Sequence, residues 1–217
     1  MNEIRNKKVM CVAVHPDDET LGCGGTLLRH MEDGDSVECL FITDGNPNQR
    51  ETIAAVSDAY GFERTHRLGL PDGRLDEEAG GMLVSSIGKV FQDVHPNVIY
   101  IPNRSDAHSD HRCIYQAIAA CTKPFRFPFI EDVLMMEVMS ETDSIPALPE
   151  TVFIPNVFID ISKQMSRKME IMKSYQSELM DYPDIRSEDS IKALSRYRGA
   201  QINVEFAEAF MLLKSIR

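Results

Sequence analysis

Apolar runs alternate with amphipathic segments through the first half of the chain. The run Val9–Val14 is continuous and rich in valine, a pattern typical of a strand that is covered on both faces. It ends at His15-Pro16, and the residue before a proline is pushed away from the helical region. Thr20–Asp33 then carries leucine and methionine at helical spacing and is closed by Gly34. The chain therefore opens as a strand, a turn and a helix.

The same alternation predicts further strands and helices. The next predicted strands are Ser36–Thr43, His66–Leu70 and Asn97–Ile101, and the next predicted helices are Glu51–Tyr60, Glu77–Val94 and Arg112–Thr122. Later in the chain, strands are predicted at Val133–Met139 and Val152–Ile161 and helices at Lys163–Met180 and Ser190–Ala200, whereas Glu205–Leu213 fits either element. Strands that alternate with helices imply right-handed crossovers, so we predict an α/β fold with a mostly parallel sheet and helices on both faces.

Composition narrows the class of protein. With 217 residues, 43% of them hydrophobic and 26% charged, the chain fits a single globular domain over residues 1–217. Its formal net charge of -11 repels polyphosphates, so we predict no general binding of nucleic acid. The apolar run near the N-terminus ends at Val14, which is too short for a signal peptide or a transmembrane segment.

The cysteines are odd in number, scattered along the chain and without a CxxC pair. They are Cys11, Cys23, Cys39, Cys113 and Cys121. This pattern is typical of reduced thiols that pack as small hydrophobic residues. It favours a reducing, cytoplasmic location.

Two polar clusters follow predicted strands and open predicted helices. They are His15-Pro16-Asp17-Asp18-Glu19 and His108-Ser109-Asp110-His111. Ligands of open α/β sheets bind outside the carboxyl ends of the strands, so we expect the clusters to meet there. Either cluster alone also fits an ordinary helix N-terminus. Together they offer the nitrogen and oxygen donors of a catalytic zinc site, and we predict that His15, Asp18 and His111 hold the metal.

The other polar residues of the clusters suit the remaining catalytic roles. Asp17 would be free to act as general base toward a water whose pKa the metal lowers toward about 7. His108 precedes His111 by one helical turn and would stabilise an oxyanion or donate a proton to a leaving nitrogen. Asp110 would fix the tautomer of a histidine ring.

The two clusters resemble the signatures of the LmbE-like, or PIG-L-like, N-deacetylase family. The first cluster, followed by Leu21-Gly22-Cys23-Gly24-Gly25-Thr26, is similar to the opening signature, and the second matches the pattern His-x-Asp-His. Weaker matches are Phe41-Ile42-Thr43-Asp44-Gly45, Leu68-Gly69-Leu70-Pro71-Asp72-Gly73, Asp160-Ile161-Ser162 with Lys168, Tyr175-Gln176-Ser177, and Arg198-Gly199 with Phe206-Ala207-Glu208-Ala209-Phe210. The resemblance implies a Rossmann-like fold and zinc-dependent hydrolysis of an N-acetyl group, commonly on a glucosamine-type sugar. It also implies the metal, base and acid assignments given above.

Three residues are candidates for binding the substrate. Members of the family often have a substrate-contacting arginine after the second strand, and Arg50 is the nearest match. Asp72 lies in a Pro-Asp-Gly turn and fits either a turn residue or an acceptor for sugar hydroxyls. Arg198 fits a structural role or a position facing the cleft. Some members carry an aromatic residue ahead of the second signature that helps close the site, where this chain has Asp106 and Ala107, so the sequence leaves open which residues would form a lid.

The two clusters predict a metal-dependent hydrolase, and the family resemblance implies that it is an N-deacetylase that releases acetate and a free amine from an N-acetylglucosamine-type conjugate. Zn²⁺ is the expected cofactor, although two histidines and a carboxylate also suit Fe²⁺ or another divalent metal. An amidase acting on another N-acyl conjugate and a metal-bound, non-catalytic sugar-binding module are the alternatives. The module would need neither Asp17 nor His108. The expected partner is a small amino-sugar substrate; its carrier, and whether the protein forms a homo-oligomer, are left open by the sequence.

Overall fold

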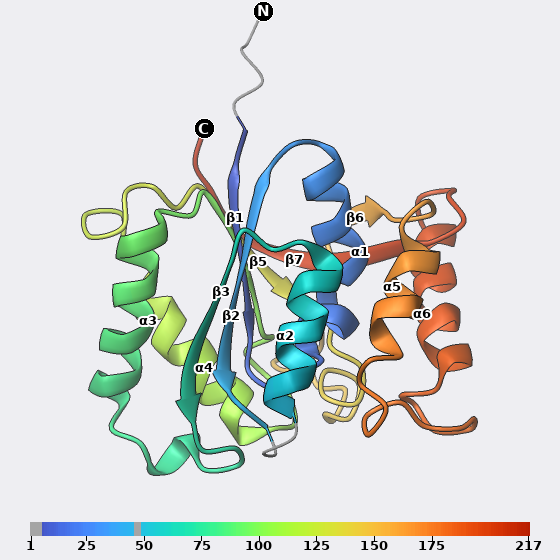
Figure 1. Ribbon diagram of the computed structural model, residues 1–217, viewed down its shortest axis with the longest axis horizontal. Coiled ribbons are helices and arrows are strands. Elements are labelled where there is room, and N and C mark those ends of the chain that lie inside the picture. Colours follow the sequence, from blue (N-terminus) through green and yellow to red (C-terminus); the bar gives the residue numbers. More distant parts are fainter. Residues whose placement is uncertain (1–5, 46–48) are drawn as a thin grey trace, which may run out of the picture.

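The computed structural model describes residues 6–45 and 49–217, and a seven-stranded sheet lies at its centre (Figure 1). The strands are β1 (Lys8–Ala13), β2 (Ser36–Thr43), β3 (Arg64–Leu70), β4 (Val98–Ile101), β5 (Asp132–Met136), β6 (Val157–Asp160) and β7 (Ala207–Ser215). Their order across the sheet is β3-β2-β1-β4-β5-β7-β6. Strands β1 to β5 pair in parallel, whereas β7 is antiparallel to both β5 and β6. The mostly parallel, Rossmann-like sheet predicted from the sequence is confirmed.

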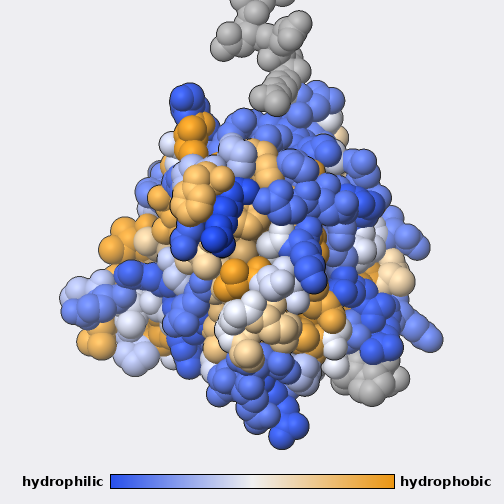
Figure 2. Space-filling view, turned by 90° about the vertical axis from the view of Figure 1, so that its left-hand side faces the viewer, coloured by the Kyte–Doolittle hydropathy of each residue, from blue (hydrophilic) through white to orange (hydrophobic). Residues whose placement is uncertain are grey.

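Helices cover both faces of the sheet (Figure 1). They are α1 (Asp18–Glu32), α2 (Gln49–Tyr60), α3 (Gly80–Val94), α4 (Ser109–Ala120), α5 (Met165–Met172) and α6 (Glu188–Ala200), with a short 3₁₀ helix, η1, at Leu75–Glu77. Helices α3 and α4 lie on one face, and α1, α2, α5 and α6 lie on the other. Figure 2 shows the molecule from the side of α3 and α4, where hydrophilic side chains surround smaller apolar areas. Among the described residues, no helix has the length and apolar character needed to cross a membrane.

Strand β1 is buried on both faces, which explains its continuous run of apolar residues. Val9, Cys11 and Ala13 pack into the core beneath α1, whereas Met10 and Val12 pack into the core beneath α3 and α4. Since successive side chains of a strand point to opposite faces, a strand buried on both sides needs apolar residues at every position.

The second half of the chain departs most from the sequence prediction. The helix predicted over Lys163–Met180 covers only Met165–Met172, and the strand predicted over Val152–Ile161 covers only Val157–Asp160. The ambiguous segment near the C-terminus is strand β7, because it pairs with strands on both sides. In the first half, the long third helix begins only at Gly80, since the backbone before it is extended at Ala79.

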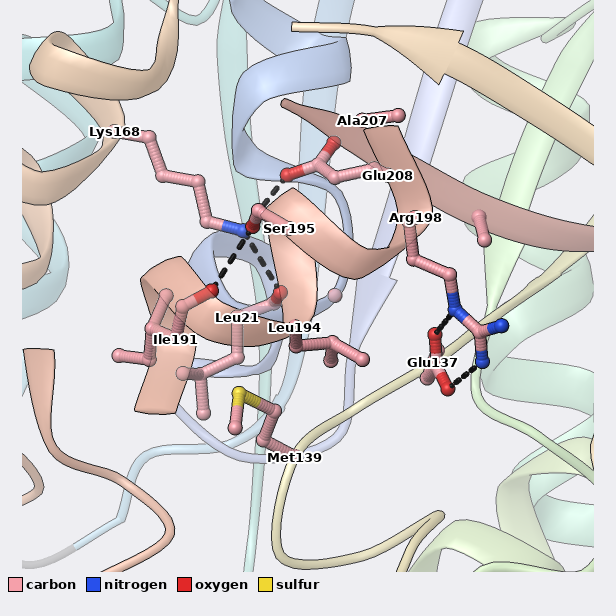
Figure 3. A pocket seen from close by; sticks show the side chains of 12 residues that line it. Leu21, Glu137, Met139, Lys168, Ile191, Leu194, Ser195, Arg198, Ala207 and Glu208 are labelled. Atoms are coloured by element: carbon pink, nitrogen blue, oxygen red, sulfur yellow. Dashed lines mark hydrogen bonds and ion pairs between the residues drawn. The ribbon is translucent and has the colours of Figure 1, made fainter. Parts of the chain in front are cut away.

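Helix α1 is kinked at Cys23, whose backbone is not helical. The Glu208 carboxylate of β7 accepts hydrogen bonds from the amides of Gly25 and Thr26, at 2.9 and 2.8 Å, where the second half of the helix starts. Lys168 Nζ donates to Leu21 O at 3.0 Å and lies 2.8 Å from Glu208 (Figure 3). This buried pair therefore supplies hydrogen bonds that the kink removes from the helix.

Close packing explains one of the glycines in the first signature. A Cβ at Gly25 would lie 2.8 Å from side-chain atoms of Ile161, so this position admits no larger residue without a shift. All five cysteines are free thiols, four of them buried, as the sequence predicts.

Candidate active site

The two polar clusters meet at the carboxyl edge of the sheet. Strands β1 and β4 are neighbours and run parallel, although the chain reaches β4 only after β2 and β3. Their carboxyl ends therefore lie side by side, where the strand order reverses direction. This is the position at which open α/β sheets bind ligands. Helices α1 and α4 both start at this edge.

His15, Asp18 and His111 converge on one point. The distance from His111 Nε2 to His15 Nδ1 is 3.3 Å, and that from His111 Nε2 to Asp18 Oδ2 is also 3.3 Å. The three donor atoms lie within 4.8 Å of one another. Two ring nitrogens and a carboxylate oxygen that face each other at this distance form a donor set suited to a divalent cation.

Carboxylates hold the opposite nitrogen of each ring. Asp106 Oδ2 is 2.8 Å from His111 Nδ1, while His15 Nε2 lies 3.1 Å from Asp72 Oδ1 and 3.4 Å from Asp110 Oδ2. A ring that donates from one nitrogen presents the lone pair of the other, so these carboxylates orient both rings toward the shared point. The residues present thus fit a metal.

The electrostatics of the site also favour a cation. Burial by itself would lower the pKa of His111, but the charges of Asp18 and Asp106 raise that pKa well above its ordinary value. The pKa of His15 also rises, to about 9, because its hydrogen bonds with Asp110 and Asp72 outweigh the effect of burial. The surroundings therefore stabilise positive charge at the point where the donors meet.

Asp17 belongs to the same turn and lines the cleft beside the three donors. Its φ of 125° lies in a region that residues with a side chain rarely adopt, and such strain is typical of functional sites. The side chain is buried, with Oδ2 3.2 Å from Arg186 Nη1. Burial, and then the charge of Asp18, raise the pKa of Asp17 well above its ordinary value, and Arg186 opposes this effect.

His108 and Asp110 have distinct partners. The His108 ring lies 4.5 Å from the His15 ring, centroid to centroid, and its Nδ1 accepts a hydrogen bond from the amide of Asp110. Neutral His108 therefore carries its proton on Nε2. Burial, and then the charge of His15, lower the pKa of His108. The Asp110 carboxylate accepts from the amides of Gly73 and Leu75 as well as contacting His15, so it ties the loop after β3 to helix α4.

A cleft of about 220 Å³ opens beside the three donors. It is lined by His15, Pro16, Asp17, Gln49, Asp72, His108, Glu141, Glu178 and Arg186. Of the three predicted substrate-binding residues, the structure thus brings Asp72 to the cleft.

The other two lie elsewhere. Arg50 pairs with Asp44 at 2.8 Å and lines a separate surface hollow. Arg198 forms a two-point ion pair with Glu137 beside the small cavity near Lys168 (Figure 3). Substrate contacts by Arg50 and Arg198 stay predictions that this geometry does not favour.

Four residues of the site were missed in the sequence. Arg186, Glu141 and Glu178 lie in irregular segments without a motif, and nothing in their spacing indicates the cleft. Asp106 stands five residues before His111, and its distance to that ring shows that it orients His111.

The chain is similar to a known protein family and to curated proteins. The profile of the family "PIG-L: GlcNAc-PI de-N-acetylase" matches residues 10–122, which include both clusters. "Uncharacterized deacetylase YaiS" of Escherichia coli (strain K12) is 25% identical over 186 residues, covering 80% of this chain and 92% of that protein. "Diacetylchitobiose deacetylase" of Thermococcus kodakarensis is 24% identical over 231 residues, covering 97% and 84%.

A solved structure shares the fold. The conserved protein TT1542 from Thermus thermophilus superposes with a TM-score of 0.76 at 24% identity, covering 97% of this chain and 96% of that one. The family match spans more than half of the chain and contains the residues that converge at the carboxyl edge of the sheet. The resemblance seen in the sequence is confirmed, and the chain belongs to the PIG-L family of de-N-acetylases.

Proposed function

We propose that the protein is a zinc-dependent hydrolase that removes the N-acetyl group from an N-acetylglucosamine-type conjugate. Family membership and the deacetylases among its relatives support this activity. The observation that carries the proposal is the convergence of His15, Asp18 and His111 beside a spare carboxylate, Asp17, at an open cleft. Zinc is proposed because it accepts imidazole and carboxylate donors together.

The side chains of the cleft divide the work of amide hydrolysis. When bound by His15, Asp18 and His111, a divalent ion would lower the pKa of water toward about 7 and polarise the acyl oxygen. Asp17 accepts a proton from the water that adds to the carbonyl carbon. His108 presents Nε2–H to the cleft, where it donates a hydrogen bond to the developing oxyanion. Asp17 then passes the proton that it took from water to the nitrogen as the C–N bond breaks. The products are acetate and a free amine.

Two substitutions test the assignment with different readouts. Asp17→Asn removes the base but none of the three donors, so it should retain zinc and lose roughly 10²–10⁴-fold in turnover. His111→Ala should lose zinc as measured by elemental analysis after dialysis. His95→Ala, at an exposed helix end, is the control and should change neither. Near-normal turnover of the Asp17 variant would refute the base assignment, and unchanged zinc in the His111 variant would refute that ligand.

A cytoplasmic location is part of the proposal, since five free thiols are typical of a reducing compartment.

A further inference from the structure

Arg186 is the one lysine or arginine among the described residues that line the cleft. Its Nε donates to Ser140 Oγ at 2.7 Å. Its Nη1 lies 3.2 Å from Asp17 Oδ2 and 3.1 Å from Glu178 Oε2, and its Nη2 lies 3.4 Å from Glu141 Oε1. All three nitrogens of the guanidinium therefore face acceptors of the protein itself. No free pair of N–H groups is left for the two-point grip that arginine uses on phosphate or carboxylate.

Carboxylates outnumber this single guanidinium around the cleft. The acidic residues that line it are Asp17, Asp72, Glu141 and Glu178. Asp72 is the most open of them, with about half of its side chain exposed and one oxygen directed at His15. Outside the three proposed metal donors, the described lining of the cleft thus has four carboxylates against one guanidinium, and the charge of Arg186 is already neutralised by its neighbours.

We propose that the cleft selects its substrate by charge, and that the preferred one is an N-acetylated amino sugar whose carrier bears an ammonium group. Neutral carriers are accepted less well, and carriers with a phosphate or carboxylate are rejected. This inference rests on the proposed deacetylase function and deepens it. An ammonium group meets the half-exposed carboxylate of Asp72, whereas an anion meets like charges and would have to displace a carboxylate from Arg186. One unit charge at about 4 Å in water is worth about fivefold in affinity, and more where solvent is partly excluded.

A matched set of substrates tests the order. N-acetylglucosamine linked to glucosamine carries an ammonium, N-acetylglucosamine linked to N-acetylglucosamine is neutral, and N-acetylglucosamine 6-phosphate is an anion. With the zinc-loaded protein, acetate release should give the lowest KM for the first and the highest for the third. The difference should shrink as salt rises, since screening weakens interactions between exposed charges. Equal KM values, or the reverse order, would overturn the proposal.

Two variants distinguish an effect of the rim charge on KM from an effect of damage to the structure of the cleft. Glu178→Gln removes one negative charge from the rim and leaves the charge of Arg186 less fully balanced, so the KM for the ammonium substrate should rise about fivefold and that for the phosphate should fall. Glu170→Gln on α5 makes the same change in net charge at an exposed position outside the cleft and should alter neither. If Glu178→Gln raises every KM equally, its role is structural and the proposal fails.

A binding measurement keeps this test independent of turnover. Calorimetry with glucosamine and with N-acetylglucosamine 6-phosphate, on zinc-loaded and chelator-treated protein, should show tighter binding of the amine in both. Absence of acetate from every substrate would refute the proposed function, while the order of the two dissociation constants would still decide the charge selection.

Discussion

Replacing Asp106 by asparagine tests how the proposed metal site is held together. The Asp106 carboxylate is fully buried, with Oδ2 2.8 Å from His111 Nδ1 and Oδ1 accepting from the Thr142 hydroxyl at 2.7 Å. Asparagine has nearly the same shape but lacks the charge that raises the basicity of the ring. Loss of a carboxylate that orients a metal-bound histidine typically weakens metal binding by about 10–100-fold, or about 1.4–2.7 kcal/mol. We expect the upper end of this range, because the pair is shielded from water.

The measurement is a zinc titration in competition with a chromophoric chelator, with circular dichroism to show that the variant is folded. Asp72→Asn is the matched control, since it also removes a carboxylate beside a ligand ring. Asp72 is about half exposed, and Asp110 contacts the same nitrogen of His15, so this variant should lose much less affinity. Unchanged zinc affinity in the Asp106 variant, or an equal loss in both, would refute the reasoning.

Three further predictions concern stability. Gly25→Ala should destabilise the fold by about 1–3 kcal/mol, because the added methyl group overpacks the core. Gly81→Ala has open space around it and should instead stabilise helix α3 by about 0.4–1 kcal/mol. Urea unfolding measures both free energies, and equal effects of the two variants would contradict the packing argument. Burial raises the pKa of Glu19 from 4.5 to about 7, so the folded protein binds the extra proton and stability should fall by on the order of 3 kcal/mol as pH rises across that window. In Glu19→Gln, unfolding in the presence of a chelator should show less of this slope, and an unchanged slope would contradict it. Lys168→Met leaves the buried carboxylate of Glu208 without its cation, so it should lower the free energy of unfolding by about 3–5 kcal/mol. A midpoint of thermal unfolding equal to that of the wild type would show that the pair contributes little.

Local pattern predicted the first half of the fold well. The valine-rich run before His15 and the alternating segments after it identify β1 to β4 and α1 to α4 to within a few residues, because burial and backbone hydrogen bonding in these elements follow short periodicities. The second half was predicted less well. The segment after α5 continues a helical pattern but leaves the helix at Lys173, and Tyr175 is buried with its hydroxyl 2.8 Å from Glu19 of α1.

The sequence by itself determined which chemical groups the site has: two imidazoles and two carboxylates, in motifs short enough to read along the chain. Only the tertiary structure decided how they are held. Asp106 orients His111, Asp110 meets His15, and Arg186 is surrounded by Asp17, Glu141 and Glu178. Most of these contacts join residues far apart in sequence, so no local pattern encodes them. They exist because the parallel sheet brings the ends of β1 and β4 to one edge, where the irregular segments of the second half of the chain close around them.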